Sequence, residues 1–252
     1  KTYTVKSDGT ETVALGRINK YSQDFSQNNQ TYSYSANDGY REPAVVTGST
    51  DDNGILYDAS TANYHGFGTA PAFLTQLETD FEEMARSVAK YKGFYVSRYE
   101  LEQGGSSVQN QPVLNADSDS AGNWYGLYKA AWNTQADRVM HSHMIWGCQY
   151  DQIMKFAKEK TRYDGTGKVF DVFIASAERQ KSDYNAGMNP ADKVCNIYDL
   201  ERNYQEWTAL ALATVVRVSR GGVYDSASDG SSYFPAVYSS GNVPDSNNDD
   251  YS

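Results

Sequence analysis

The last quarter of the chain joins two different kinds of sequence, and this join constrains the fold most. Residues 195–222 are rich in aliphatic and aromatic side chains and end in the pair Gly221-Gly222. Residues 224–252 consist mainly of Tyr, Ser, Asp, Asn, Gly and Pro. The first stretch has the composition of packed scaffold ending in a turn, and the second has the composition of surface. We therefore expect a core that ends near Gly222 and a polar segment displayed beyond it.

The chain as a whole is long enough to bury a substantial core. No internal repeat or linker-like stretch divides it, which favours one α+β domain with large loops. We predict that residues 66–252 form this domain and that residues 1–65 form an extended or hairpin segment packed on it. The chain starts at Lys1 without a visible signal peptide, so we expect an excised or processed fragment.

Short alternating pieces at residues 3–5 and 12–15 flank Ser7-Asp8-Gly9, which predicts a β-hairpin. Residues 23–38 contain few apolar side chains and are predicted to be irregular. Residues 42–46 are predicted to be a short extended segment after a turn.

The clearest helix starts near Pro71, where proline suits a first helical turn, and Gly93 suits its end. Apolar residues recur at steps of three and four, which places them on one face: Phe73, Leu77, Phe81, Met84 and Val88. Asp80, Glu82 and Glu83 are expected on a solvated face. The pattern indicates a helix that packs on the core.

Further elements follow along the chain. Alternation predicts strands at 93–100 and 169–174, separated from each other by a polar loop at 104–122 and by two helical regions. Residues 124–132 form an aromatic segment leading into the second helix. Residues 149–160 predict the third helix, with one apolar side made by Ile153, Phe156 and Ala157.

The charge of the chain excludes one class of partner. A net charge of −10 and no basic stripe argue against nucleic-acid binding. No apolar run is long enough to span a bilayer, so membrane insertion is not expected. Acidic loops suit solubility or calcium binding. The 21 Tyr against 9 Phe favour either a binding face or a Tyr-rich sheet, because a buried hydroxyl needs a partner.

The cysteines and histidines give weak catalytic signals. Cys148 and Cys195 could form one disulfide or stay free, and neither has metal-site spacing. Cys148 begins a helix, so a lowered pKa with His143 as base is one hypothesis, but a buried structural thiol or a bond to Cys195 is favoured. His141 and His143 would share a strand face as a metal pair, yet ordinary hydrogen-bonded histidines are favoured, and His65 has no companion. The sequence contains no nucleophile elbow or phosphate loop, so the residues by themselves do not point to an enzymatic activity.

Asn203 and Glu206 are hard oxygen donors three positions apart, flanked by Tyr204 and Trp207. Such a pair, with backbone carbonyls, can hold Ca²⁺ in a loop. A capping Asn and a surface Glu are the alternative.

Four motifs, in order, resemble the formylglycine-generating-enzyme-like domains, also known as sulfatase-modifying-factor domains. Residues 196–207 look like their Asn-Ile-x-Asp-Leu-x-Gly-Asn-Val-x-Glu-Trp signature, and residues 217–222 resemble their Arg-Val-x-Arg-Gly-Gly turn. Residues 93–100 resemble their early Phe-Tyr-Ile-x-Arg-Tyr-Glu strand, and residues 147–151 resemble their Gly-x-Gln-Trp-Asp helix. The resemblance implies a C-type-lectin-like α+β fold with few helices, short twisted sheets and much irregular loop.

Three departures from the family pattern affect the expected activity. Arg202 replaces a glycine beside the possible calcium ligands Asn203 and Glu206. The catalytic members use a cysteine pair after the Arg-Gly-Gly turn, and no cysteine follows Cys195. The chain ends at Ser252, where the family's closing Gly-Phe-Arg strand would begin. The resemblance therefore implies a non-catalytic member.

The non-catalytic branch includes the variable proteins of diversity-generating retroelements, found on phage tips and bacterial surfaces. Their ligand face follows the Arg-Gly-Gly turn, which places it at residues 223–252 here, with Pro235-Ala236 and Pro244 as framework. The implied partner is a protein or glycan on a target surface, outside the cell, and a homo-oligomer is compatible with this role. The implied contact residues are Tyr224, Asp225, Ser226, Ser228, Asp229, Ser231, Ser232, Tyr233, Phe234, Tyr238, Ser240, Asn242, Asp245, Asn247, Asp249 and Tyr251.

The composition of this segment agrees with a binding face, because Tyr gives large contact area and Ser, Asn and Gly give adaptable hydrogen bonds. A disordered polar tail is the alternative for the segment. Two other functions stay open. One is an oxidase with a shifted site at Cys148 and Cys195, and the other is a structural virion or cell-surface module whose tail packs on a neighbouring subunit.

Overall fold

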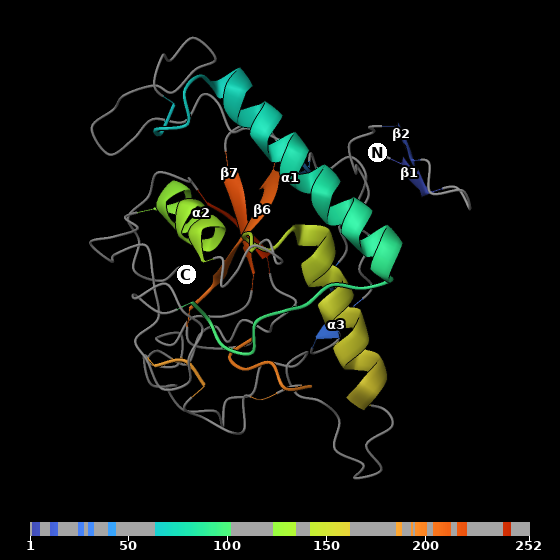
Figure 1. The fold of residues 1–252 in the computed structure, drawn as a ribbon. Helices are drawn as coiled ribbons and strands as arrows, with labels where there is room; N and C mark the ends of the chain where they lie inside the picture. Colours follow the sequence, from blue (N-terminus) through green and yellow to red (C-terminus); the bar gives the residue numbers. More distant parts are fainter. Residues whose placement is uncertain are drawn as a thin grey trace.

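A computed structural model gives the fold of the chain. It describes residues 2–5, 11–14, 25–27, 30–32, 40–43, 64–101, 123–134, 142–161, 185–187, 193, 195–200, 204–212, 216–220 and 239–242. Within these residues the chain is α+β, as predicted, with helices and antiparallel sheets (Figure 1). The helices are α1 (Ala70–Tyr91), α2 (Trp124–Asn133) and α3 (Gly147–Thr161).

The main sheet is built from both ends of the described chain. Its strands are β5 (Tyr40–Arg41), β6 (Glu206–Leu212), β7 (Val216–Arg220) and β8 (Ser239–Asn242), in the order β5-β6-β7-β8. In β5, Tyr40 pairs with Leu212 of β6. Segments far apart in sequence therefore form one antiparallel sheet.

Two small hairpins lie in the N-terminal part. β1 (Thr2–Val5) pairs with β2 (Glu11–Ala14), which confirms the hairpin predicted there. β3 (Phe25–Gln27) pairs with β4 (Gln30–Tyr32). The prediction that residues 23–38 are irregular is therefore wrong over this hairpin, because strand pairing uses backbone groups and does not require an apolar run.

α1 follows the pattern of its sequence closely. The Thr69 hydroxyl accepts a hydrogen bond from Ala72 N at 3.3 Å, which caps the first turn. The end of the helix is set by Lys92, one residue before the predicted Gly93. Lys92 takes the left-handed conformation, with φ 62°, and its N–H donates to Val88 O at 2.8 Å. The predicted apolar face is confirmed: Phe73, Leu77, Phe81 and Met84 are buried and Val88 is half-buried.

The predicted acidic face of α1 is wrong at one position. Asp80 is only 4% exposed, and it accepts a hydrogen bond from the Tyr128 hydroxyl of α2. Glu83 is exposed as expected, and Glu82 is half-buried. Helical spacing places Asp80 at the border of the apolar face, and the neighbouring helix supplies the hydroxyl that allows its burial.

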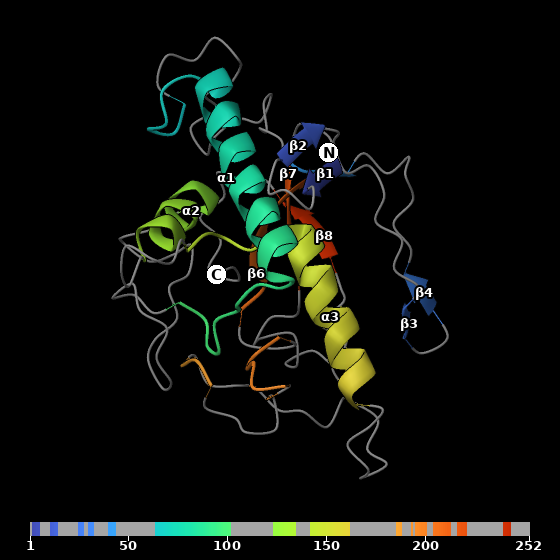
Figure 2. The ribbon, with the colours of Figure 1, turned by 45° about the vertical axis from the view of Figure 1, so that its right-hand side comes forward.

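The core lies where α1 and α2 cover β6. The residues that fill it are mainly aromatic: Tyr64, Phe73, Phe81, Trp124, Tyr125, Tyr128, Trp146 and Trp207. Trp124 Nε1 donates to Thr208 O of β6 at 2.9 Å, and this bond docks α2 on the sheet. In both ribbon views, β6 and β7 lie between α2 and α3 (Figures 1 and 2). The tyrosines of this core are buried with bonded hydroxyls, as in the 2.7 Å contact between the Tyr64 and Tyr125 hydroxyl oxygens.

Other predicted elements have mixed outcomes. Residues 124–132 are themselves the second helix, and the third helix begins at Gly147, slightly earlier than predicted. Residues 93–100 form no strand, so that prediction is wrong; no strand that the structure describes pairs with them. In α3, Ile153 is buried but Phe156 is 50% exposed. The predicted strand at 169–174 and the loop at 104–122 lie outside the described residues. No helix in the described ranges is both long and apolar enough to cross a membrane.

Candidate functional site

The strand β7, which leads into the polar segment, is anchored by a buried ion pair. Arg220 Nη2 lies 2.6 Å from Asp151 Oδ1 of α3, with the arginine side chain 1% exposed. Burial raises the pKa of Asp151, and the neighbouring Arg220 opposes this rise. The Arg220 guanidinium carbon also lies 5.4 Å from the centre of the Tyr150 ring. The end of β7 is thereby fixed to α3.

The rest of β7 is fixed on the other side of the sheet and within it. The Ser219 hydroxyl donates to Gln205 Oε1 at 2.7 Å. Arg217 is fully buried, donates from Nη1 to Ala209 O at 3.0 Å, and stacks over Trp124 with its guanidinium carbon 4.1 Å from the ring centre. Burial lowers the pKa of Arg217, and nearby tyrosines and Glu42 partly offset this lowering.

β8 brings the C-terminal segment back to this anchored strand. Arg220 pairs with Ser239, and Arg217 pairs with Asn242. Residues 221–238, which connect these two paired strands, lie outside the described residues. Of the predicted contact residues, Ser240 and Asn242 lie in β8, the last strand in the sheet order. The remaining ones, from Tyr224 to Tyr238 and from Asp245 to Tyr251, lie outside the described residues.

Glu206, one of the two predicted calcium ligands, begins β6 beside other carboxylates. Its Oε2 atom is buried and has no hydrogen-bond partner among the described residues. Burial raises its pKa well above the ordinary value, and Glu100 and Asp199 raise it further. The alternative of an ordinary surface Glu is therefore wrong. A buried acceptor without a partner in an acidic setting is compatible with a cation.

The other parts of the predicted calcium site are less complete. Asn203 and Arg202 lie outside the described residues. Asp199 already accepts a hydrogen bond from Gly187 N at 2.6 Å and is itself in the left-handed region, with φ 66°. Over the described ranges, no three His, Cys, Asp or Glu side chains converge closely enough to hold a metal. Glu206 would need Asn203 and backbone oxygens as further ligands.

Neither cysteine forms a disulfide, so of the two favoured states of Cys148 the bond to Cys195 does not form. Cys195 is exposed and Cys148 is half-buried at the start of α3. Burial, and secondly the Glu42 carboxylate, raises the pKa of Cys148, so the predicted lowering is wrong. Glu42 contributes because its carboxylate occupies the N-terminal end of the helix, accepting from Gly147 N at 2.6 Å and Cys148 N at 3.2 Å.

The histidines take part in packing and local hydrogen bonds. His143 Nδ1 lies 2.8 Å from Met144 O, and burial lowers the pKa of His143. His65 stacks on Tyr125 with 3.5 Å between ring centres. His141 lies outside the described residues, so the less favoured alternative of a metal pair with His143 is not tested.

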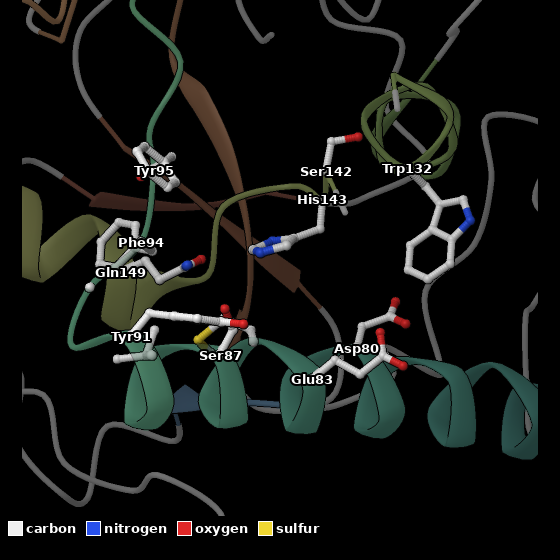
Figure 3. A pocket seen from close by; sticks show the side chains of 13 residues that line it. Asp80, Glu83, Ser87, Tyr91, Phe94, Tyr95, Trp132, Ser142, His143 and Gln149 are labelled. Atoms are coloured by element: carbon white, nitrogen blue, oxygen red, sulfur yellow. The ribbon is translucent and has the colours of Figure 1, made fainter. Parts of the chain in front are cut away.

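A cavity of about 470 Å³ was missed at the level of sequence (Figure 3). It lies between the C-terminal half of α1, the segment after it, the end of α2 and the start of α3. Because its walls come from separate parts of the chain, no local pattern indicates it.

Comparison with known proteins finds no relative of this chain. No protein-family model, curated protein or solved structure matches it.

Proposed function

We propose that this chain is a non-catalytic display domain that binds a protein or glycan through residues 224–251. The proposed fold is the C-type-lectin-like fold of formylglycine-generating-enzyme-like domains, and the proposed role is that of a variable protein on a phage or bacterial surface. The observation that carries the proposal is the pairing of β7 with β8, which joins a Tyr- and Ser-rich segment to a buried strand at both of its ends.

The physical basis is a division between scaffold and variable side chains. β7 is held by Asp151, Gln205 and Trp124, none of which belongs to the displayed segment. The contacts of β7 that the structure describes would therefore persist when side chains in residues 221–238 change. Tyr and Ser at such positions provide contact area and adaptable hydrogen bonds.

A calcium ion beside Glu206 belongs to the same proposal. Glu206 would supply the buried carboxylate and Asn203 a side-chain oxygen. The unpartnered Oε2 atom and the neighbouring Glu100 and Asp199 support a cation there. When bound, the ion would neutralise these carboxylates and hold the start of β6 in place.

Tolerance to substitution tests the division directly. A library that randomises Tyr224, Tyr233 and Tyr238 is expected to yield mostly folded chains, with thermal midpoints close to that of the parent. A matched library at Arg217, Ser219 and Arg220 is expected to yield mostly unfolded ones. Equal loss of folding in both libraries would contradict a display segment.

Sequencing and binding test the function itself. Sequencing the 3′ end of the gene in a population should show nucleotide variation concentrated in the codons for residues 224–251, beside a near-identical template repeat. A uniform sequence without a repeat removes the retroelement version.

Binding is tested on a glycan array and a panel of purified bacterial envelope proteins. Changing the four tyrosines Tyr224, Tyr233, Tyr238 and Tyr251 to Ala should abolish the signals seen with the parent chain. Changing Phe156, an exposed aromatic residue of α3 outside the cavity, to Ala should preserve them.

A further inference from the structure

The cavity beside α1 has aromatic walls. Tyr91 ends α1, Phe94 and Tyr95 follow it, and Trp132 lies near the end of α2. Tyr91 is 69% exposed and Tyr95 is 98% exposed, so these rings form the open rim. The chain itself places a cation against this rim, with Lys90 Nζ 4.9 Å from the centre of the Tyr91 ring. Aromatic faces attract organic cations in this way.

The charged side chains that line the cavity among the described residues are both acidic. They are Asp80 and Glu83 of α1; Lys90 lies against the exposed Tyr91 ring and is not one of the described lining residues. In Figure 3 both carboxylates point from α1 toward the space that Trp132 and His143 face. Glu83 makes no hydrogen bond or ion pair with any residue that the structure describes. His143 adds no opposing positive charge at neutral pH, because burial lowers its pKa.

The remaining polar groups of the cavity are already oriented by the fold. The Gln149 Oε1 atom accepts from Trp146 N at 3.1 Å, and the Ser142 hydroxyl donates to Ala131 O at 2.6 Å. These bonds fix the wall opposite α1 independently of any ligand. The cavity is thus a shaped site with acidic side chains on one wall and aromatic rings at its rim.

We propose that this cavity binds an organic cation, the ammonium or guanidinium group of a basic side chain or of a small amine of the same size. The volume of about 470 Å³ lies within the range of about 300–1,000 Å³ usual for small-ligand sites. The cation would lie between the Glu83 and Asp80 carboxylates, with its carbon chain against Tyr95 and Trp132. None of the lining residues that the structure describes belongs to β7 or β8, and the variants below leave residues 224–251 unchanged, so this site and the display function can fail separately.

Titration calorimetry on the full chain tests the charge requirement with three probes. Nα-acetyl-arginine methylamide and agmatine carry the guanidinium group, and Nα-acetyl-norleucine methylamide is the uncharged analogue. We expect saturable binding of the first two and at least about tenfold weaker binding of the third, corresponding to about 1.4 kcal/mol. Tighter binding of the blocked arginine points to a polypeptide side chain as the source, and tighter binding of agmatine points to a free amine.

Matched variants locate the binding in the cavity. Glu83→Gln and Tyr95→Ala change exposed side chains, so both should fold normally while weakening guanidinium binding by roughly threefold to tenfold. Glu82→Gln is the control. It removes the same charge from the neighbouring residue, whose side chain does not line the cavity. Equal binding of the norleucine analogue, or equal effects of Glu82→Gln and Glu83→Gln, would overturn the proposal.

Discussion

The end of β7 at Arg220 and the cavity beside α1 both hold charged side chains. Among the described residues, only the end of β7 pairs its charge with an opposite one. Arg220 there lies against Asp151, and Glu42 accepts two backbone N–H groups at the start of α3. In the cavity, Asp80 accepts a hydrogen bond from Tyr128, and the exposed Glu83 side chain makes no ion pair with a described residue. Charges that the protein pairs internally stabilise the fold, whereas charges left facing a cavity are available to a ligand. Four substitutions test this difference, in order of decreasing effect.

The largest effect is expected from Asp151→Ala. This change leaves the buried Arg220 guanidinium without its carboxylate and should lower the free energy of unfolding by about 3 kcal/mol. Urea denaturation with a constant m-value measures it. The double variant with Arg220→Met removes both charges and should recover much of the loss. A double variant no more stable than the single one would show that the pair itself is not the cause.

Glu42→Ala should have the next largest effect. It leaves Gly147 N and Cys148 N, at the N-terminal end of α3, without an acceptor. The unfolding free energy should fall by about 2 kcal/mol. Glu42→Gln keeps an acceptor oxygen and should lose less. The control is Glu82→Ala on α1, whose ion pair with Arg86 is long, at 4.0 Å, and solvent-accessible, so it should change stability little.

Glu206→Gln distinguishes an internal charge from a ligand-binding one. Because burial raises the folded-state pKa of Glu206 above its ordinary 4.5, the folded chain favours the protonated form. The stability this gives is present below the ordinary pKa and is lost as the pH rises through the folded value. In chelator at neutral pH, Glu206→Gln should therefore stabilise the chain, by roughly 1 kcal/mol.

Added calcium should make the parent chain more stable than the Glu206→Gln variant, the reverse of the order expected in chelator. If Glu206 holds Ca²⁺, added calcium stabilises the parent chain and not the Glu206→Gln variant. Thermal unfolding of both chains with chelator and with calcium measures this. A calcium response of equal size in both chains would place the ion elsewhere.

The smallest effect on stability is expected from Glu83→Lys, which supplies the cavity with an internal cation. Because the side chain is exposed, the unfolding free energy should change by less than about 0.5 kcal/mol. Guanidinium binding should nevertheless be lost, since the new ammonium group lies beside Asp80. Retained binding would mean that the cavity does not select charge.

The elements with local causes could be predicted from the sequence. The spacing of Phe73, Leu77 and Phe81 predicts α1, because apolar residues three and four apart lie on one helical face. The first hairpin follows from two alternating pieces around Asp8-Gly9. At residues 93–100 the same kind of alternation predicted a strand that does not form, because a strand also needs a neighbour with free backbone groups.

The candidate sites were predictable to different extents. The composition after Gly222 predicts a display segment, and Ser240 and Asn242 now have a place in β8. Glu206 was identified by its spacing from Asn203, but its burial was not. The cavity was not predictable, because Glu83 and Trp132 are distant in sequence and line the same cavity only after α1 and α2 have packed.

By itself, the sequence determined the start and the apolar face of α1, the first hairpin, and where scaffold composition changes to surface composition. These properties depend on neighbours within a few residues. Only the tertiary structure decided that Glu42 caps α3, that Asp80 is buried against Tyr128, and that β8 returns to β7. Each of these joins distant segments, and the free energy of burying a polar group depends on the partner that the rest of the fold brings to it.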